Sequence, residues 1–267
     1  MTTMTRAVTD SATMLRRQLR HAQRYPALSV GIAGLPIIFL LLFVYVFGGA
    51  LGAGLGGAGG TGGGRSEYVN YVTPGIILMT AASGALSTSV SVCTDMTEGI
   101  IARFRTMAIA RVSMLTGHVL GSLIQTMGSM TILLVVAFAI GFRPNANPVE
   151  WIAAIAVMLM TTVALTWLSV GIGVWCKTPE SASNVPLPLQ LMPFMGSGFV
   201  PTDSMPAGLK TFAEYQPFTP IIETLRGLLL GGPIGSSAVQ SIAWCGGITL
   251  VSYIWAKRLF NRDPSTR

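Results

Sequence analysis

The chain has 267 residues, a net charge of +7, 51% hydrophobic residues and 10% charged residues, with a mean hydropathy of +0.62. Soluble domains carry about 25% charged residues, so this composition excludes a soluble fold and indicates an all-α integral membrane protein. The length accommodates about six spans of roughly 20 residues, which leaves no room for a separate catalytic domain. Basic residues that flank spans account for the positive charge, so we expect no nucleic-acid partner.

The first 26 residues predict a cytoplasmic tail and an amphipathic interfacial helix over residues 11–25. One face of this helix is narrow and apolar, and the other carries Arg16, Arg17, Arg20, His21 and Arg24. A basic face of this kind binds anionic lipid headgroups. Pro26 interrupts the helical pattern before the first span.

We predict a single permease domain over residues 27–256, followed by a cytoplasmic tail over residues 257–267. Its six predicted spans cover residues 27–49, 71–92, 113–142, 151–175, 181–200 and 239–256. The three cysteines are isolated from one another in the sequence, so we expect neither a disulfide nor a metal site.

A glycine-rich stretch follows the first span, from residue 48 to residue 65. It contains a formal GxGxxG at Gly52, Gly54 and Gly57, but the nucleotide-binding fingerprint requires a strand before it and a helix after it. Gly and Ala bury little surface, so the stretch predicts a flexible loop.

The second predicted span carries hydroxyl side chains at spacings of three and four, namely Thr80, Ser83, Ser87 and Ser91. They are candidate lining for a transport path. The alternative, which we favour, is close helix packing with the hydroxyls bonded back to the backbone.

Residues 94–117 lie between two apolar spans yet carry five charged residues, Asp95, Glu98, Arg103, Arg105 and Arg111. A charge at the bilayer centre costs roughly 2.5–3.5 kcal/mol, so this segment lies in water or at the membrane surface. Apolar residues recur at spacings of three, four and seven, which predicts an amphipathic helix. It either docks on a partner protein or rests on lipid headgroups.

His118, in the third span, is interpreted as a packed or interfacial residue rather than a proton relay. The fifth span contains Pro186, Pro188 and Pro193. Proline frees backbone carbonyls and kinks a membrane helix, so this span is a candidate hinge, with a static kink as the alternative.

The loop before the last span contains a short apolar helix that is predicted to dip into the bilayer and return. Thr219 is the expected N-cap, Pro220 the first helical residue and Gly231 the terminator. Glu223 and Arg226, three residues apart, are expected to pair on its water-facing side.

Six spans place both termini on one side of the membrane. Thirteen of the 17 Lys and Arg residues then fall on that side. The positive-inside rule predicts that both termini, and the 94–117 segment, are cytoplasmic.

The chain resembles the type-2 ABC transporter permeases, especially the daunorubicin-resistance-like exporters of actinobacteria. Three patches carry the resemblance: Arg24-Tyr25-Pro26; Glu98-Gly99-Ile100 with the three arginines that follow; and Phe199-Val200-Pro201, Met205-Pro206, Pro217-Phe218-Thr219-Pro220 and Leu225-Arg226-Gly227-Leu228. The chain departs from the family at Ala108, where proline is frequent, and near Ser122, where an acidic residue is frequent.

The resemblance implies a subunit of the bacterial inner (plasma) membrane that pairs with a second permease, identical or homologous, and with two ATPase subunits. The segment between the second and third spans would be the coupling helix, with Asp95, Glu98, Arg103, Arg105 and Arg111 as ATPase contacts. The chain lacks GxxxxGK[ST], so ATP and Mg²⁺ are expected on the partner ATPase and no cofactor on this chain. An amphipathic drug or lipid is the expected cargo.

Three alternatives are weighed against this hypothesis. An ion-coupled secondary transporter usually carries ionisable residues inside its spans, and here His118 alone is clearly so placed. An ABC exporter of polysaccharide fits the same layout. A membrane enzyme would need clustered acid, base or metal-binding groups, which the sequence lacks.

Overall fold

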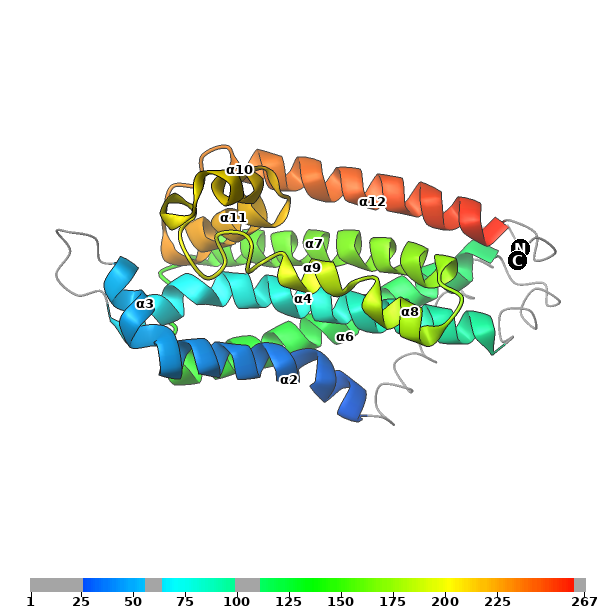
Figure 1. Ribbon diagram of the computed structural model, residues 1–267, viewed down its shortest axis with the longest axis horizontal. Coiled ribbons are helices and arrows are strands. Elements are labelled where there is room, and N and C mark those ends of the chain that lie inside the picture. The colour runs from blue at the N-terminus through cyan, green and yellow to red at the C-terminus, as the bar shows by residue number, and fades with distance from the viewer. Residues whose placement is uncertain (1–25, 56–63, 99–110, 262–267) are drawn as a thin grey trace.

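The computed structural model of this chain describes residues 26–55, 64–98 and 111–261. Every regular element in these ranges is helical, and the long helices lie along one common axis (Figure 1). Within the described ranges, five stretches are long and apolar enough to cross a membrane: Gly31–Gly54, Arg65–Thr97, Leu115–Ile140, Pro148–Trp175 and Ser237–Phe260. The predicted all-helical membrane fold is thus confirmed. The predicted interfacial helix over residues 11–25 lies outside the described residues.

The first span is longer than predicted. Helix α2 (Pro26–Leu42) continues through a π-helical turn, η1 (Phe43–Phe47), into α3 (Gly48–Leu55). The expectation of a loop from residue 48 onward is therefore wrong for residues 48–55. A helix that is already nucleated extends at little cost, and Gly52 lets α3 pack closely on the residue before α4, since an added Cβ would lie 2.5 Å from the Gly64 carbonyl oxygen.

Helix α4 (Arg65–Thr97) is the central helix of the bundle. In the apolar 18-residue stretch of α4, 78% of the residues are buried, whereas in the corresponding stretch of α12 (Ser237–Asn261) 17% are buried. It packs against α6 (Arg111–Ile140) and α7 (Pro148–Trp175). These helices and α12 correspond to the second, third, fourth and sixth predicted spans, with somewhat different ends.

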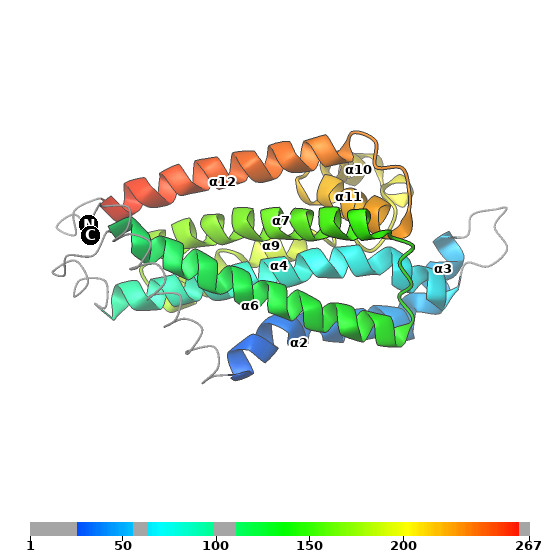
Figure 2. The same cartoon turned by 180° about the vertical axis from the view of Figure 1, so that it is seen from behind.

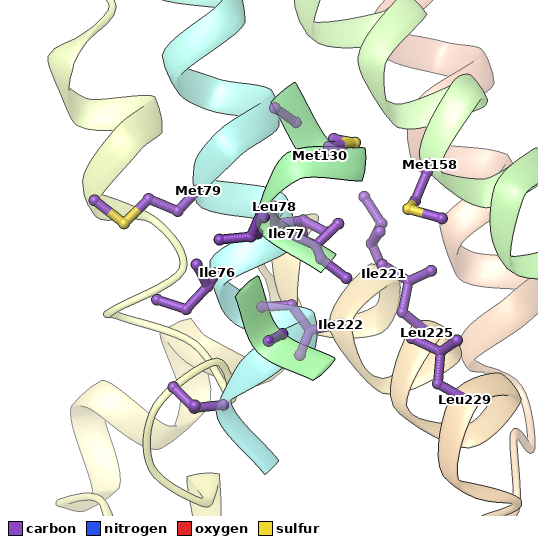
Figure 3. Close-up of a cluster of buried hydrophobic side chains, with 14 of the residues drawn as sticks. Ile76, Ile77, Leu78, Met79, Met130, Met158, Ile221, Ile222, Leu225 and Leu229 are labelled. Atoms are coloured by element: carbon purple, nitrogen blue, oxygen red, sulfur yellow. The ribbon is translucent and has the colours of Figure 1, made fainter. Parts of the chain in front are cut away.

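The main apolar core is formed where α4 meets α6, α7 and α11 (Phe218–Leu230). Figure 3 shows side chains of this core from all four helices, namely Ile76, Ile77, Leu78 and Met79 from α4, Met130 from α6, Met158 from α7, and Ile221, Ile222, Leu225 and Leu229 from α11.

The fifth predicted span is not one continuous helix. It consists of α8 (Pro179–Asn184), α9 (Leu187–Leu191) and a series of turns, although the segment still runs from one end of the bundle to the other (Figure 1). Pro186, Pro188 and Pro193 have no N–H to donate, so the helix is broken where the sequence predicts a kink. An aromatic cluster holds the turns in place. The Phe199 ring stacks on the Phe194 ring with 4.1 Å between the ring centroids, and its centroid lies 4.6 Å from that of Phe43.

The two ends of the bundle differ in structure. One end, here the Arg226 end, holds η3 (Thr202–Ser204), α10 (Ala207–Tyr215) and α11. At the other, here the Asp95 end, α4 ends, α6 begins and α12 ends (Figures 1 and 2). Helix α11 confirms the predicted short helix and terminates at Gly231 with φ +76°, as expected. Its N-cap is Pro217 rather than the predicted Thr219, which lies in the first turn, and α10 was not predicted.

Candidate functional site

The predicted coupling segment begins in the last turn of α4. The Thr94 and Thr97 hydroxyls donate to the Val90 and Cys93 carbonyls, which supports the helix up to its end. Glu98 follows, exposed, and its N–H donates to the Thr94 carbonyl at 2.9 Å. The structure therefore fixes where the segment leaves α4 and, at Arg111, where it enters α6.

The remaining predicted coupling residues are only partly covered. Arg103 and Arg105 lie outside the described residues, as does the 99–110 part of the predicted coupling helix. Arg111 is the first residue of α6. Helical structure between α4 and α6 thus stays a prediction.

Asp95 does not lie on the exposed surface that its predicted docking role suggests. Its carboxylate Oδ2 lies 3.1 Å from His118 Nε2 on α6, and the side chains of Asp95 and His118 are only 12% and 5% exposed. Asp95 is three residues after Val92, and His118 is three after Leu115, so each polar residue shares a helix face with an apolar one. Val92 and Leu115 belong to one cluster with α7 and α12. The sequence interpretation of His118 as a packed residue missed this partner.

Two further contacts continue the same interface between α4 and α6. The hydroxyls of Thr88 and Ser122 are hydrogen-bonded. One turn further, Gly84 faces Thr126 so closely that an added Cβ would lie 2.9 Å from Thr126 Cγ2 and 3.0 Å from its Cβ. We name the three contacts Asp95–His118, Thr88–Ser122 and Gly84–Thr126 the α4–α6 seam.

The four hydroxyl residues proposed as path lining separate into two pairs. Thr80 and Ser83 are buried and donate to the Ile76 and Met79 carbonyls, at 2.9 and 3.0 Å. These two bonds are of the back-bonded type that we favoured. Ser83 also accepts from Gln190 of α9 at 2.9 Å. Ser87 is half-buried and Ser91 is exposed.

At the opposite end, Arg226 joins three segments. Its guanidinium donates to Glu223 Oε1 at 2.5 Å, to the Ser197 carbonyl at 2.7 Å and to the Tyr71 carbonyl at 3.2 Å. Its Cζ atom also lies over the Tyr71 ring, 3.8 Å from the ring centroid. The Glu223–Arg226 pairing is confirmed, but Arg226 is only 14% exposed. The guanidinium therefore points toward α4 and the turns after α9, not toward water as predicted.

Small residues allow this close approach at the Arg226 end. A Cβ added to Gly75 of α4 would lie 2.6 Å from the Gly198 carbonyl oxygen. Pro220 is buried, and its carbonyl accepts from the Thr224 hydroxyl at 2.7 Å. At each end of the bundle a charged side chain joins separate segments, namely Arg226 at one end and Asp95, through His118, at the other. Within the described ranges, no three His, Cys, Asp or Glu residues gather closely enough to hold a metal ion.

Comparison with known proteins gives a consistent result. The family described as ABC-2 type transporter matches residues 10–230. The daunorubicin resistance ABC transporter permease protein DrrB1 of Streptomyces coeruleorubidus is 26% identical over 84% of this chain and 76% of its own length. The probable doxorubicin resistance ABC transporter permease protein DrrC of Mycobacterium tuberculosis is 24% identical over 83% of this chain and 77% of its own length.

Proposed function

This chain belongs to the ABC-2 type transporter family and is a multi-pass membrane permease, and on that premise we propose that it forms the membrane path of an ATP-driven exporter of amphipathic drugs. The single observation that carries the proposal is the family match over residues 10–230, which extends through the helical bundle as far as α11. The names of the two relatives support an anthracycline as cargo. A lipid is the alternative cargo of similar amphipathic chemistry.

The proposed arrangement is two ABC ATPase subunits, a second permease and this chain, in a bacterial plasma membrane with both termini in the cytoplasm. ATP and Mg²⁺ would be bound by the ATPases. The asymmetry of Lys and Arg supports this orientation. It places the Asp95 end on the cytoplasmic side, where an ATPase could reach the segment that joins α4 to α6.

We propose that the ATPase docks on this segment through Glu98, Arg103, Arg105 and Arg111, and that Asp95 supports it from within the bundle. Glu98 is exposed at the C-terminal end of α4. A negative charge there is disfavoured by the helix dipole, by about 0.3–1 kcal/mol. A basic group on the partner would relieve this, which supports an ion pair across the docking interface.

The test of docking is Glu98→Arg in the full chain, reconstituted with its ATPase partner and assayed with daunorubicin. We expect the variant to insert in the membrane in normal amount but to lose drug-stimulated ATP hydrolysis. The matched control is Glu67→Arg, an exposed glutamate in the first turn of the same helix at the opposite end. Unchanged stimulated hydrolysis in Glu98→Arg would refute the docking role. A wild-type complex that responds to a fluorescent phospholipid and not to daunorubicin would favour the lipid cargo.

We further propose that the path follows the less buried part of the hydroxyl stripe, at the half-buried Ser87 and the exposed Ser91, on the helix that packs against α8 and α9. Asn184 of α8 is exposed, and Gln190 of α9 contacts the same stripe at Ser83. Polar groups at membrane depth face a protein or a water-filled cavity rather than lipid. Pro186, Pro188 and Pro193 are the positions at which we expect the segment that contains α8 and α9 to bend.

A thiol at position 91 tests this path. We expect Ser91→Cys to react with a maleimide in the reconstituted complex and daunorubicin to slow the reaction. The matched control is Thr131→Cys, an exposed hydroxyl position on α6 away from α8 and α9, whose reaction daunorubicin should leave unchanged. Equal protection at both positions, or none at position 91, would contradict the assignment.

A further inference from the structure

The three contacts of the α4–α6 seam follow one another in antiparallel order, with steps of seven and four residues along α4 and of four and four along α6. Along α4 the residues descend from Asp95 through Thr88 to Gly84, while along α6 they ascend from His118 through Ser122 to Thr126. The spacing on α6 is four residues at each step, which places its three side chains on one face of the helix. Polar or close backbone contacts therefore define how the two helices lie against each other.

Apolar packing alone would not fix this register in a membrane. Lipid tails are as apolar as leucine, so the bilayer supplies little hydrophobic drive for one helix to stay aligned with another. Hydrogen-bonded pairs differ, because a shift of one turn along the helices would separate Asp95 from His118 and Thr88 from Ser122 and so lose the free energy of both contacts. The Asp95–His118 pair is the strongest of these restraints, since it includes a carboxylate that is mostly buried.

The position of this pair ties it to the segment between the helices. Asp95 is two residues before the end of α4 at Thr97, and His118 is seven residues after the start of α6 at Arg111. The pair thus joins the two helices close to where the intervening segment leaves one and enters the other. A force applied to that segment reaches both helices, and without the pair it could separate them instead of moving them.

We propose that Asp95 and His118 are positioning residues that hold α4 and α6 as one body, so that motion of the segment between them is passed to both helices together. The inference rests on the proposed docking of an ATPase on that segment. Side chains next to the pair then carry the motion onward, because Val92, Leu115 and Val119 pack with residues of α7 and α12, namely Trp167, Val170, Val174, Ala256 and Phe260.

The first experiment uses the full chain with its ATPase and measures daunorubicin-stimulated ATP hydrolysis in Asp95→Asn, His118→Gln and the exchanged variant Asp95→His with His118→Asp. We expect each single variant to bind the ATPase but to lose stimulation by about tenfold, within the usual range of a coupling free energy between sites. The exchanged variant should recover most of it, because it restores the same pair of groups. Single variants that stay fully stimulated, or an exchanged variant that folds but recovers nothing, would overturn the proposal.

A second experiment locks the seam covalently. In a chain whose cysteines Cys93, Cys176 and Cys245 are replaced by alanine, Thr88→Cys and Ser122→Cys place two thiols where the two hydroxyls now touch. If α4 and α6 move as one body, oxidation to the disulfide should leave stimulated hydrolysis intact. Loss on oxidation with recovery on reduction would show that the helices must slide, which overturns the proposal.

The melting temperature of the purified permease alone separates this inference from the proposed function. The Asp95→Asn and His118→Gln changes should be non-additive there, because they remove the same contact. Non-additive melting together with a wild-type complex that daunorubicin does not stimulate would count against the drug-export proposal and not against the pair. Additive melting would count against the pair itself.

Discussion

The Arg226 end and the Asp95 end of the bundle are both held by a charged side chain, but in different ways. Arg226 donates to two main-chain carbonyls, those of Ser197 and Tyr71, as well as to Glu223. Asp95 instead pairs with another side chain, that of His118. The first arrangement joins α11, α4 and the turns after α9, whereas the Asp95–His118 pair joins α4 to α6.

This difference indicates which end of the bundle has the more strongly restrained backbone. A guanidinium that bridges carbonyls from separate segments restrains the backbone directly. At the same end, Gly75 and Gly198 pack so closely that no side chain fits between their backbones. At the Asp95 end the pair holds α4 against α6, next to the segment on which we propose that the ATPase docks. We therefore expect changes at the Arg226 end to act mainly on stability, and changes at the Asp95 end mainly on coupling.

The largest expected loss of stability follows from a substitution of Arg226. Arg226→Met removes the donors to both carbonyls and to Glu223, so we expect a loss of stability on the order of 3 kcal/mol, since charged hydrogen bonds contribute about 1.5–3 kcal/mol each and are not additive. Arg226→Lys keeps the charge but loses the planar fork, so its loss should be intermediate. The measurement is the melting temperature of the purified chain in detergent.

The control for Arg226 is Lys210→Met at the same end. Lys210 forms an ion pair with Asp203 at 2.7 Å, but both groups are exposed to solvent, and exposed pairs contribute little. We expect no measurable change in melting temperature. If Arg226→Met melted like Lys210→Met, the contrast between the two ends would fail, because the bridging contacts would then carry no stability.

Contacts within one helix were accessible from the sequence, and contacts between helices were not. The Glu223–Arg226 pair follows from a spacing of three, and the αL terminator Gly231 from residue type alone. The bonds of Arg226 to Ser197 and of Asp95 to His118 depend on which helices are neighbours and in what register. Hydropathy places the spans in the chain but says nothing about their register.

Some local features were also missed, for identifiable physical reasons. The fourth span is predicted to begin at residue 151, yet Asn147 and Glu150 form a reciprocal capping box that starts α7 three residues earlier. The pattern Asn-Pro-Val-Glu carries that signal and could have been used. Helix continuation through Gly48–Leu55 had no such signal, because it depends on packing against Gly64 and Arg65.

A smaller loss of stability is expected from a substitution at the α4–α6 seam. Gly84→Ala would place a methyl group against the Thr126 side chain, whose Oγ1 is the nearest atom and whose Cγ2 and Cβ would lie 2.9 and 3.0 Å away, so Thr126 must shift, and we expect α6 to shift with it. Overpacking of this kind costs about 1–3 kcal/mol. Gly128→Ala is the matched control, because it adds the same methyl to a helix of the same seam where nothing lies within 4 Å. That control should gain up to about 1 kcal/mol from helix propensity.

Two readouts on this pair of variants separate stability from coupling. Gly84→Ala should lower the melting temperature less than Arg226→Met, yet it should reduce drug-stimulated ATP hydrolysis more, because displacement of α6 also draws His118 away from Asp95. Gly128→Ala should leave stimulation unchanged. The reverse order, with Arg226→Met the more uncoupled variant at equal protein amount, would mean that the Arg226 end moves during transport and that the Asp95 end is the fixed one.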